Sequence, residues 1–130
     1  MENCVEEGQT LYYNLEDRTF QFAKSVRNFV KKLPRNVVNM EDSKQVVRSS
    51  GSIGANYIEA NEALSKADFI YRIKICRKES KETTYWIRLI QETNDSVFHK
   101  ECSSLIAESL EIRKIFASIC AKTNLPNRRT

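Results

Sequence analysis

The sequence has few of the residues that interrupt helices. Only 3 glycines and 2 prolines occur among its 130 residues, whereas lysine, glutamate, leucine, isoleucine, alanine and serine are plentiful. Glycine and proline are the least favourable residues in a helix interior, so their scarcity favours long helices with few breaks. The length suits one domain with one continuous hydrophobic core. We therefore expect residues 1–130 to form a single all-α domain.

Long apolar runs are also missing. The longest span only a few residues, such as Trp86-Ile87 and Leu89-Ile90, and the first residues show no basic stretch followed by an apolar one. A membrane-spanning helix needs about 20 consecutive apolar residues, and a secretion signal needs a basic start before its apolar segment. We expect neither, and no membrane partner.

Histidine and closely spaced cysteines are scarce as well. His99 is the only histidine, and Cys4, Cys76, Cys102 and Cys120 are far apart, with no Cys-x-x-Cys pair. A tetrahedral zinc site needs closely spaced pairs of such ligands, so no zinc site is predicted. Isolated cysteines are typical of reduced thiols in a cytoplasmic protein.

The charge is distributed unevenly. The chain has 21 basic and 17 acidic side chains, and five of the acids lie in residues 1–17, which contain no base. The rest of the chain therefore has 12 acids against 21 bases. This excess favours a polyanionic partner.

Four stretches carry apolar or small side chains spaced alternately by three and four residues, the pattern of a helix with one buried face. The four stripes are Leu15, Thr19, Phe22, Val26, Phe29 and Leu33; Val46, Ser50, Ile53, Tyr57, Ala60 and Leu64; Phe69, Ile73, Cys76, Ser80, Thr83, Ile87 and Ile90; and Phe98, Cys102, Leu105, Ser109, Ile112, Phe116 and Ile119. They predict helices at about residues 15–33, 40–64, 66–93 and 96–122, with tails at 1–13 and 124–130. Short connections between helices favour an antiparallel up-down-up-down four-helix bundle.

Two helix starts carry capping signals. Asn39, followed by Glu41 and Asp42, is a suitable N-cap for the second helix. Ser65, followed three residues later by Asp68, resembles a capping box for the third. These residues predict where both helices begin.

The third and fourth helices carry a second stripe beside the first. Its members are Ile75, Glu79, Glu82, Trp86 and Leu89 on the third helix, and Ile106, Leu110 and Ala117 on the fourth. The stripe either widens the core of the bundle or forms an interface between subunits.

Two glycines stand close together in the second helix. Gly51 and Gly54 could let backbone amides approach a phosphate, but no Gly-Lys-Ser/Thr follows them, and Ile53 stays in phase with its stripe. We therefore favour small residues that let another helix approach closely.

Acidic residues on facing helices suggest either a metal site or a structural network. Glu59, Glu79 and Glu82 could hold two metal ions, but such bundle sites also use Glu-x-x-His pairs, which this sequence lacks. We therefore expect no metal, no other cofactor and no catalytic residue. The favoured interpretation is a polar cluster that sets helix register. Its expected members are Arg48, Ser52, Asn56, Glu59, Glu79 and Glu82.

Two groups of basic residues are candidate nucleic-acid contacts. They are Lys24, Arg27, Lys31, Lys32 and Arg35 near the end of the first helix, and Lys74, Arg77, Lys78, Lys81 and Arg88 on the third. Cations in such lines neutralise phosphates, and Tyr71 and Tyr85 on the same outer face could stack on exposed bases. The alternative is a solvated surface with ion pairs inside the helix, for example between Arg88 and Glu92.

Three ordered segments resemble the four-helix-bundle proteins encoded in 23S ribosomal RNA intervening sequences. They are residues 45–60 (QVVRSSGSIGANYIEA), 65–69 (SKADF) and 77–87 (RKESKETTYWI). The resemblance places Arg48, Ser52, Asn56, Glu59, Glu79, Glu82 and Trp86 at signature positions, with no catalytic role attached. It also implies bacterial proteins that assemble as pentameric rings. The accessory protein of diversity-generating retroelements, which is similar in fold, binds nucleic acid and a reverse transcriptase.

The residues and the resemblance together predict a non-enzymatic homo-oligomer in the cytoplasm. Its basic outer faces would bind RNA or another nucleic acid, and it could serve as a scaffold for a protein partner. The alternative is a protein–protein interaction module that binds no nucleic acid.

Overall fold

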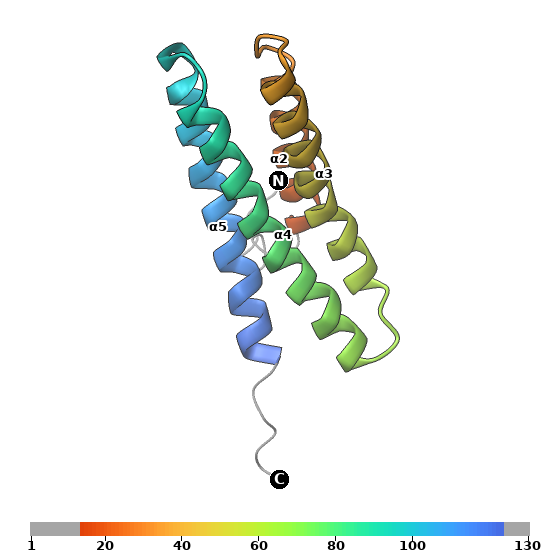
Figure 1. Cartoon of the computed structure of the whole chain (residues 1–130). Coiled ribbons are helices and arrows are strands. Elements are labelled where there is room, and N and C mark those ends of the chain that lie inside the picture. Colours follow the sequence, from red (N-terminus) through yellow and green to blue (C-terminus); the bar gives the residue numbers. More distant parts are fainter. Residues whose placement is uncertain (1–13, 124–130) are drawn as a thin grey trace, which may run out of the picture.

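The computed structural model describes residues 14–123, which are almost entirely helical and contain no strand. The helices are α2 (Leu15–Val30), α3 (Val37–Asn61), α4 (Lys66–Glu92), a short 3-10 helix η1 (Ser96–Phe98) and α5 (His99–Thr123). Short loops join α2 to α3 and α4 to α5 at one end of the molecule, and α3 to α4 at the other (Figure 1). The predicted tails lie outside the described residues. None of the described helices is long and apolar enough to cross a membrane.

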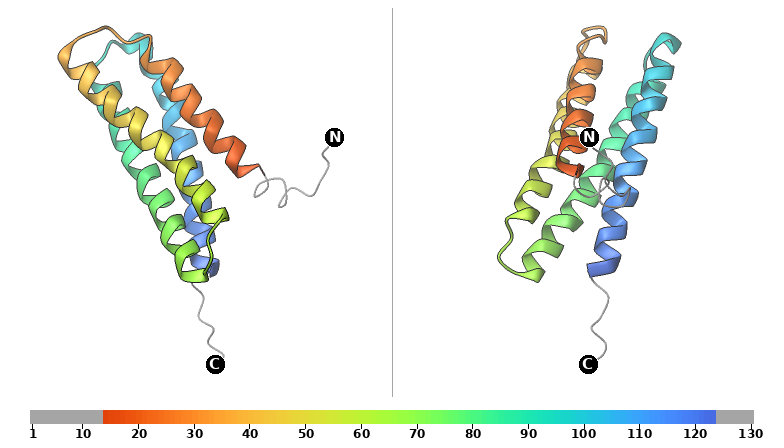
Figure 2. Two further views of the ribbon diagram at one scale, coloured as in Figure 1. Left: turned by 90° about the vertical axis from the view of Figure 1, so that its right-hand side faces the viewer. Right: turned by 180° about the vertical axis from the view of Figure 1, so that it is seen from behind.

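The four long helices pack in the order of the sequence. Contacts are most extensive between α3 and α4 and between α4 and α5, and α2 packs mainly on α3 and more sparsely on α5. With 16 residues, α2 is much shorter than α3 and α5, which have 25 each. It therefore covers only part of the length of the bundle (Figure 2). Arg18 fastens it to α5 with two hydrogen bonds of 2.7 and 2.9 Å to Glu108.

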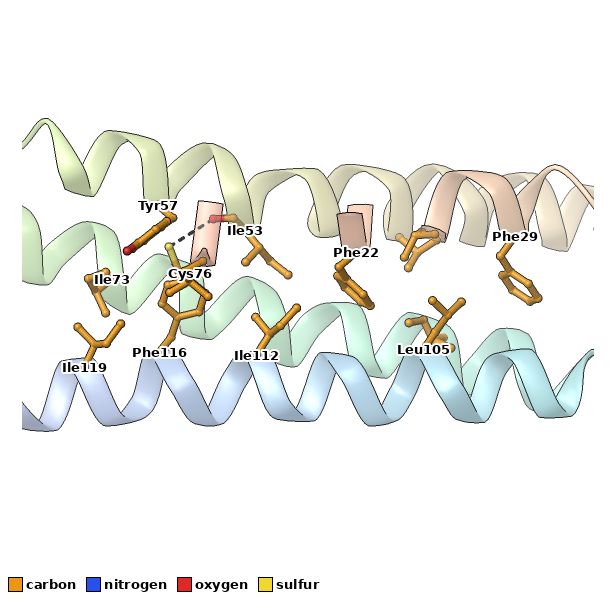
Figure 3. Packing of buried hydrophobic residues seen from close by; sticks show 14 of the residues in the cluster. Phe22, Phe29, Ile53, Tyr57, Ile73, Cys76, Leu105, Ile112, Phe116 and Ile119 are labelled. Atoms are coloured by element: carbon orange, nitrogen blue, oxygen red, sulfur yellow. Dashed lines mark hydrogen bonds between the residues drawn. The ribbon is translucent and has the colours of Figure 1, made fainter. Parts of the chain in front are cut away.

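The core contains nearly all of the predicted stripes. Phe22, Ile53, Ile73, Ile112 and the other members shown in Figure 3 meet between the helices, and almost every predicted stripe residue is buried. Phe69 and Phe98 are only partly buried and pack at the edge of the core. Leu64 is an error of the prediction, because it is 98% exposed. The helix that should have carried it ends at Asn61, so Leu64 lies in the α3–α4 loop.

Several helix ends differ from the sequence-based expectation. The first helix ends at Val30 rather than near residue 33, yet Leu33 is still buried, because a turn bonds its N–H to the carbonyl of Val30. The last helix begins at His99, after η1. The predicted start at Ser65 agrees with the structure, since its hydroxyl accepts a hydrogen bond from the Asp68 N–H at 3.0 Å.

The start of the second helix is the clearest correction. Asn36, not Asn39, is the N-cap: its backbone is extended and its side chain accepts a 2.8 Å hydrogen bond from the Asn39 N–H. Asn39 is buried and its amide group instead donates to the carbonyl of Pro34 and exchanges two 2.9 Å hydrogen bonds with Asn94. Asn39 thus joins the loop between α2 and α3 to the loop after α4.

Buried hydroxyl groups link the helices inside the core. The Ser49 and Thr83 hydroxyls lie 2.8 Å apart between α3 and α4, and those of Thr84 and Ser109 lie 2.6 Å apart between α4 and α5. Thr83 and Ser109 also donate to carbonyls of their own helices. Hydroxyls that are buried and bonded in this way favour one helix register, because a shift would leave them unpaired.

The two glycines of α3 face α2. A Cβ atom at Gly54 would lie 2.9 Å from Oγ1 of Thr19, a buried, β-branched residue whose hydroxyl bonds to the carbonyl of Leu15. A Cβ atom at Gly51 would lie 3.0 Å from Nη2 of Arg27, the end of a flexible side chain. Close helix approach therefore depends on Gly54 more than on Gly51.

This difference predicts opposite effects of two alanine substitutions. Alanine is favoured over glycine in a helix by about 1 kcal/mol, so Gly51→Ala should raise the free energy of unfolding by up to that amount. Gly54→Ala meets the rigid Thr19, and overpacking of about 1–3 kcal/mol should outweigh the same gain. Urea denaturation of both variants tests this. Equal stability of the two variants would contradict the assigned contact.

Candidate functional site

One polar cluster joins α3 to α4 around Arg48. Its guanidinium Nη2 lies 2.6 Å from an oxygen of Glu82 and 3.3 Å from an oxygen of Glu79. Glu79 is only 6% exposed, and Arg48 is the partner that balances its charge. An unpaired buried carboxylate is strongly unfavourable, so this contact holds α3 and α4 in one register.

Trp86 completes this cluster on α4. Its indole N–H donates a 3.0 Å hydrogen bond to Glu82, one helical turn earlier. This bond is the main reason why the pKa of Glu82 lies below its usual range, and the hydrogen bond from Arg48 lowers it further, against the effect of burial. Glu82 is therefore held as a carboxylate with both of its partners in place.

The remaining members of the predicted cluster are arranged differently. Asn56 donates 2.9 Å hydrogen bonds to the carbonyl and hydroxyl of Ser52, and accepts one of 2.9 Å from Arg72. These three residues form a second tie between α3 and α4. Glu59 joins neither group, because its side chain is exposed and has no hydrogen bond or ion pair within residues 14–123.

Arg72 is the residue that the sequence analysis missed. It lies seven residues before Glu79, which itself lies seven residues before Trp86, so all three follow one line along α4. Residues at heptad spacing share a helix face. A search for a cation on that line would have found Arg72.

These residues offer little for acid–base or nucleophilic chemistry. Arg48 already pairs with the carboxylates of Glu79 and Glu82. No group of three potential metal ligands occurs within the described part of the chain. Burial raises the pKa of the Cys76 thiol to about 12 and that of Cys102 to about 11, so both are protonated at neutral pH. Thiols in that state are poor nucleophiles. Cys4 lies outside the described residues.

The predicted nucleic-acid contacts of α4 lie on its outer face. All five predicted contacts on this helix are exposed: Lys74, Arg77, Lys78, Lys81 and Arg88. None of the five forms an ion pair with a carboxylate among residues 14–123, so the expected pair between Arg88 and Glu92 is not formed. This face therefore presents uncompensated positive charge.

The basic residues near the end of α2 are exposed too, but two of them already have partners within the chain and are less available to bind phosphates. Lys32 binds both oxygens of Glu101 on α5 at 2.9 and 3.0 Å. Arg27 donates to the carbonyls of Ala23 and Val47 and lies against Gly51. Lys24, Lys31 and Arg35 have no such partner among the described residues, and Arg35 lies in the loop after α2. Because α2 and α4 sit diagonally in the bundle, the two basic groups face different sides.

A mostly apolar groove of about 470 Å³ runs between α2 and α3. It is lined by small residues, including Ala23, Gly51 and Ala55, and by the exposed side chains of Phe20 and Ile58. Exposed apolar residues that line a groove together are typical of an interaction site.

Known proteins match both the sequence and this helical arrangement. The family described as 23S rRNA-intervening sequence protein matches residues 13–118. The chain belongs to this family. No curated protein matches the chain.

A solved structure supports the family assignment. It is a protein of unknown function from the S23 ribosomal protein family of Bacteroides thetaiotaomicron, 36% identical to this chain, with a TM-score of 0.72. The match covers 82% of this chain and 97% of that one. Neither the family description nor this relative indicates an enzyme. The match to the 23S rRNA-intervening sequence protein family includes the Arg48 cluster and both basic groups.

The low pKa of Glu82 predicts a pH-dependent contribution to stability. A carboxylate whose pKa is lower in the folded than in the unfolded state stabilises the fold above its unfolded pKa. That contribution is lost as the pH falls through the folded value. Arg48 is half exposed and water screens the pair, so we expect Glu82→Gln to lower the unfolding free energy at pH 7 by roughly 0.5–1 kcal/mol.

Urea denaturation at several pH values between 7 and 3 measures this effect. The difference between wild type and Glu82→Gln should shrink below about pH 4.5 and vanish in stronger acid. Glu41→Gln, in the exposed Lys44–Glu41 pair, is the matched control and should change little at any pH. A Glu82→Gln effect that is independent of pH would show that its charge does not act in this way.

Proposed function

We propose that this chain is a non-enzymatic, self-associating protein that binds RNA or another nucleic acid through its basic outer faces. Its building block is an antiparallel up-down-up-down four-helix bundle, and we place it in the cytoplasm. The observation that carries the proposal is the outer face of α4, where five exposed cations have no ion pair among the described residues. The name of the family, 23S rRNA-intervening sequence protein, is consistent with such a partner.

The electrostatic argument favours α4 over α2 as the main contact. Cations that neutralise phosphates release bound counterions, and this release supplies most of the affinity of non-specific nucleic-acid binding. A cation that already pairs with a carboxylate, as Lys32 does with Glu101, has less to contribute. Lys31 and Arg35 then form a second, weaker contact on another side of the bundle, whereas Lys24 lines the groove between α2 and α3.

Self-association is supported by the groove between α2 and α3. Exposed Phe20 and Ile58 are apolar side chains that a second copy of the chain would cover. The groove lies away from the outer face of α4, so one copy can bind its neighbour and a nucleic acid together. The family resemblance implies a pentamer, and closed rings need such a head-to-tail interface.

The same groove supports a second candidate function. It could receive a different protein, and the basic residues would then only keep the surface solvated. Two results together would favour this function over the first proposal. A pull-down after nuclease treatment would recover one defined protein partner, and the purified protein would bind no nucleic acid.

The first proposal predicts binding that depends steeply on salt. Filter binding of a labelled single-stranded RNA from 50 to 300 mM salt should show affinity falling with each increase. Each phosphate contact to a single strand contributes about 0.7 to the log–log slope, so Lys74→Gln/Lys81→Gln/Arg88→Gln should reduce the slope by about 2. The control Lys44→Gln/Lys100→Gln/Lys114→Gln removes equal charge elsewhere and should leave most of the slope. Absence of binding at low salt, or a slope of zero, would overturn the proposal.

The second prediction concerns assembly. Native mass spectrometry of the wild type should give a multiple of the 15.1 kDa chain mass, and five copies are expected. Phe20→Ser/Ile58→Ser should shift the population to the single chain, because both residues are exposed and their loss leaves the core intact. Leu64→Ser, outside the groove, is the control and should keep the assembly. A wild-type mass of one chain would contradict self-association.

A further inference from the structure

The outer face of α4 combines aromatic and basic residues in two neighbouring lines. Tyr71, Lys78 and Tyr85 follow one another at seven-residue spacing, and Lys74, Lys81 and Arg88 do the same three residues further along. Each residue of a helix turns about 100°, so seven residues fall only about 20° short of two full turns. The two lines therefore run side by side along the same face.

Both tyrosines present their rings to solvent. Tyr71 is 59% exposed and Tyr85 is 55% exposed, and neither hydroxyl forms a hydrogen bond within residues 14–123. Each ring also has one neighbour on its own helix: the Arg72 guanidinium lies over the Tyr71 ring, 5.8 Å from its centre, and the Tyr85 and Trp86 rings form a T-shaped pair with centres 5.2 Å apart. More than half of each tyrosine remains exposed and can receive another flat ring.

Between Tyr71 and Arg88, the surroundings of this face favour an anion. Glu82 is the acid that lies beside this part of the tyrosine line, and its carboxylate is bound by Arg48 and Trp86. Lys78 lies close enough to help lower the pKa of Glu82, so no uncompensated negative charge borders the line there. Glu92 follows Tyr85 at the same seven-residue spacing, is exposed and has no ion pair within residues 14–123. Phosphates between Tyr71 and Arg88 would therefore meet cations without a competing carboxylate, and this stretch ends at Glu92.

We infer that this face of α4 binds single-stranded nucleic acid, with unpaired bases stacked on Tyr71 and Tyr85 and phosphates beside Lys74, Lys81 and Arg88. The inference rests on the proposed function and narrows its substrate class. The two tyrosines lie 14 residues apart, about 21 Å along the helix, so a strand of several nucleotides can reach both. A duplex offers phosphates but hides the faces of its bases. Lysine and arginine alone would bind a duplex readily, whereas the exposed rings add affinity only for unpaired bases.

Fluorescence anisotropy with four 15-nucleotide probes tests the inference: single-stranded and duplex forms of the same sequence, each as RNA and as DNA. The wild type should bind the single strand at least 10-fold more tightly than the duplex, in RNA, DNA or both. Tyr71→Gln/Tyr85→Gln should weaken single-strand binding by roughly 10-fold for each tyrosine and leave the duplex affinity and the salt slope unchanged. Tyr71→Phe/Tyr85→Phe keeps the rings and should bind as the wild type does.

The results separate this inference from the proposed function. Wild-type binding of the duplex that equals or exceeds single-strand binding would overturn the inference alone, without the need for any variant. Unchanged single-strand binding by the glutamine variant, with its helical circular dichroism intact, would also overturn it alone. A wild type that binds none of the four probes at 50 mM salt would overturn both. A single-strand preference that is seen with RNA alone, or with DNA alone, supports the inference and identifies which nucleic acid is the ligand.

Discussion

The contact between α3 and α4 positions the rest of the molecule. Arg48 reaches across it to a nearly buried carboxylate, Glu79, and to Glu82, while the Ser49 and Thr83 hydroxyls meet inside the core. A carboxylate in such a place requires a charged partner, and a hydroxyl there requires a hydrogen bond. A slide of one helix by a turn would leave all of these groups unpaired. The polar contacts therefore select one register from the several that apolar side chains alone would tolerate.

This register also decides what the outside of α4 displays. With α3 on one flank and α5 on the other, Glu79 and Glu82 are turned toward Arg48, and the five cations of the outer face are left in solvent. The same helix thus uses two of its carboxylates for internal contacts and presents most of its cations outward. A protein with a formal net charge of only +4 can in this way offer a strongly basic surface.

The apolar groove beside the short α2 lies apart from the basic face of α4. Gly54 lets α2 approach α3 closely at Thr19, while the small residues and exposed Phe20 beside this contact leave the apolar groove open. The groove and the α4 face belong to different sides of the bundle. Assembly and ligand binding can therefore be altered by separate substitutions.

The sequence by itself determined the helices and their buried faces, because helical periodicity is a property of one segment and needs no knowledge of its neighbours. It also predicted that Arg48, Glu79 and Glu82 belong to one polar cluster between the second and third helices. Only the tertiary structure decided which polar groups meet. The rotation of each helix and the reach of long side chains put Arg72 beside Asn56, left Glu59 in solvent and placed the two basic groups on different sides. It also made Asn39 a tie between loops instead of a cap, because its partner Asn94 lies 55 residues away and no local pattern connects the two.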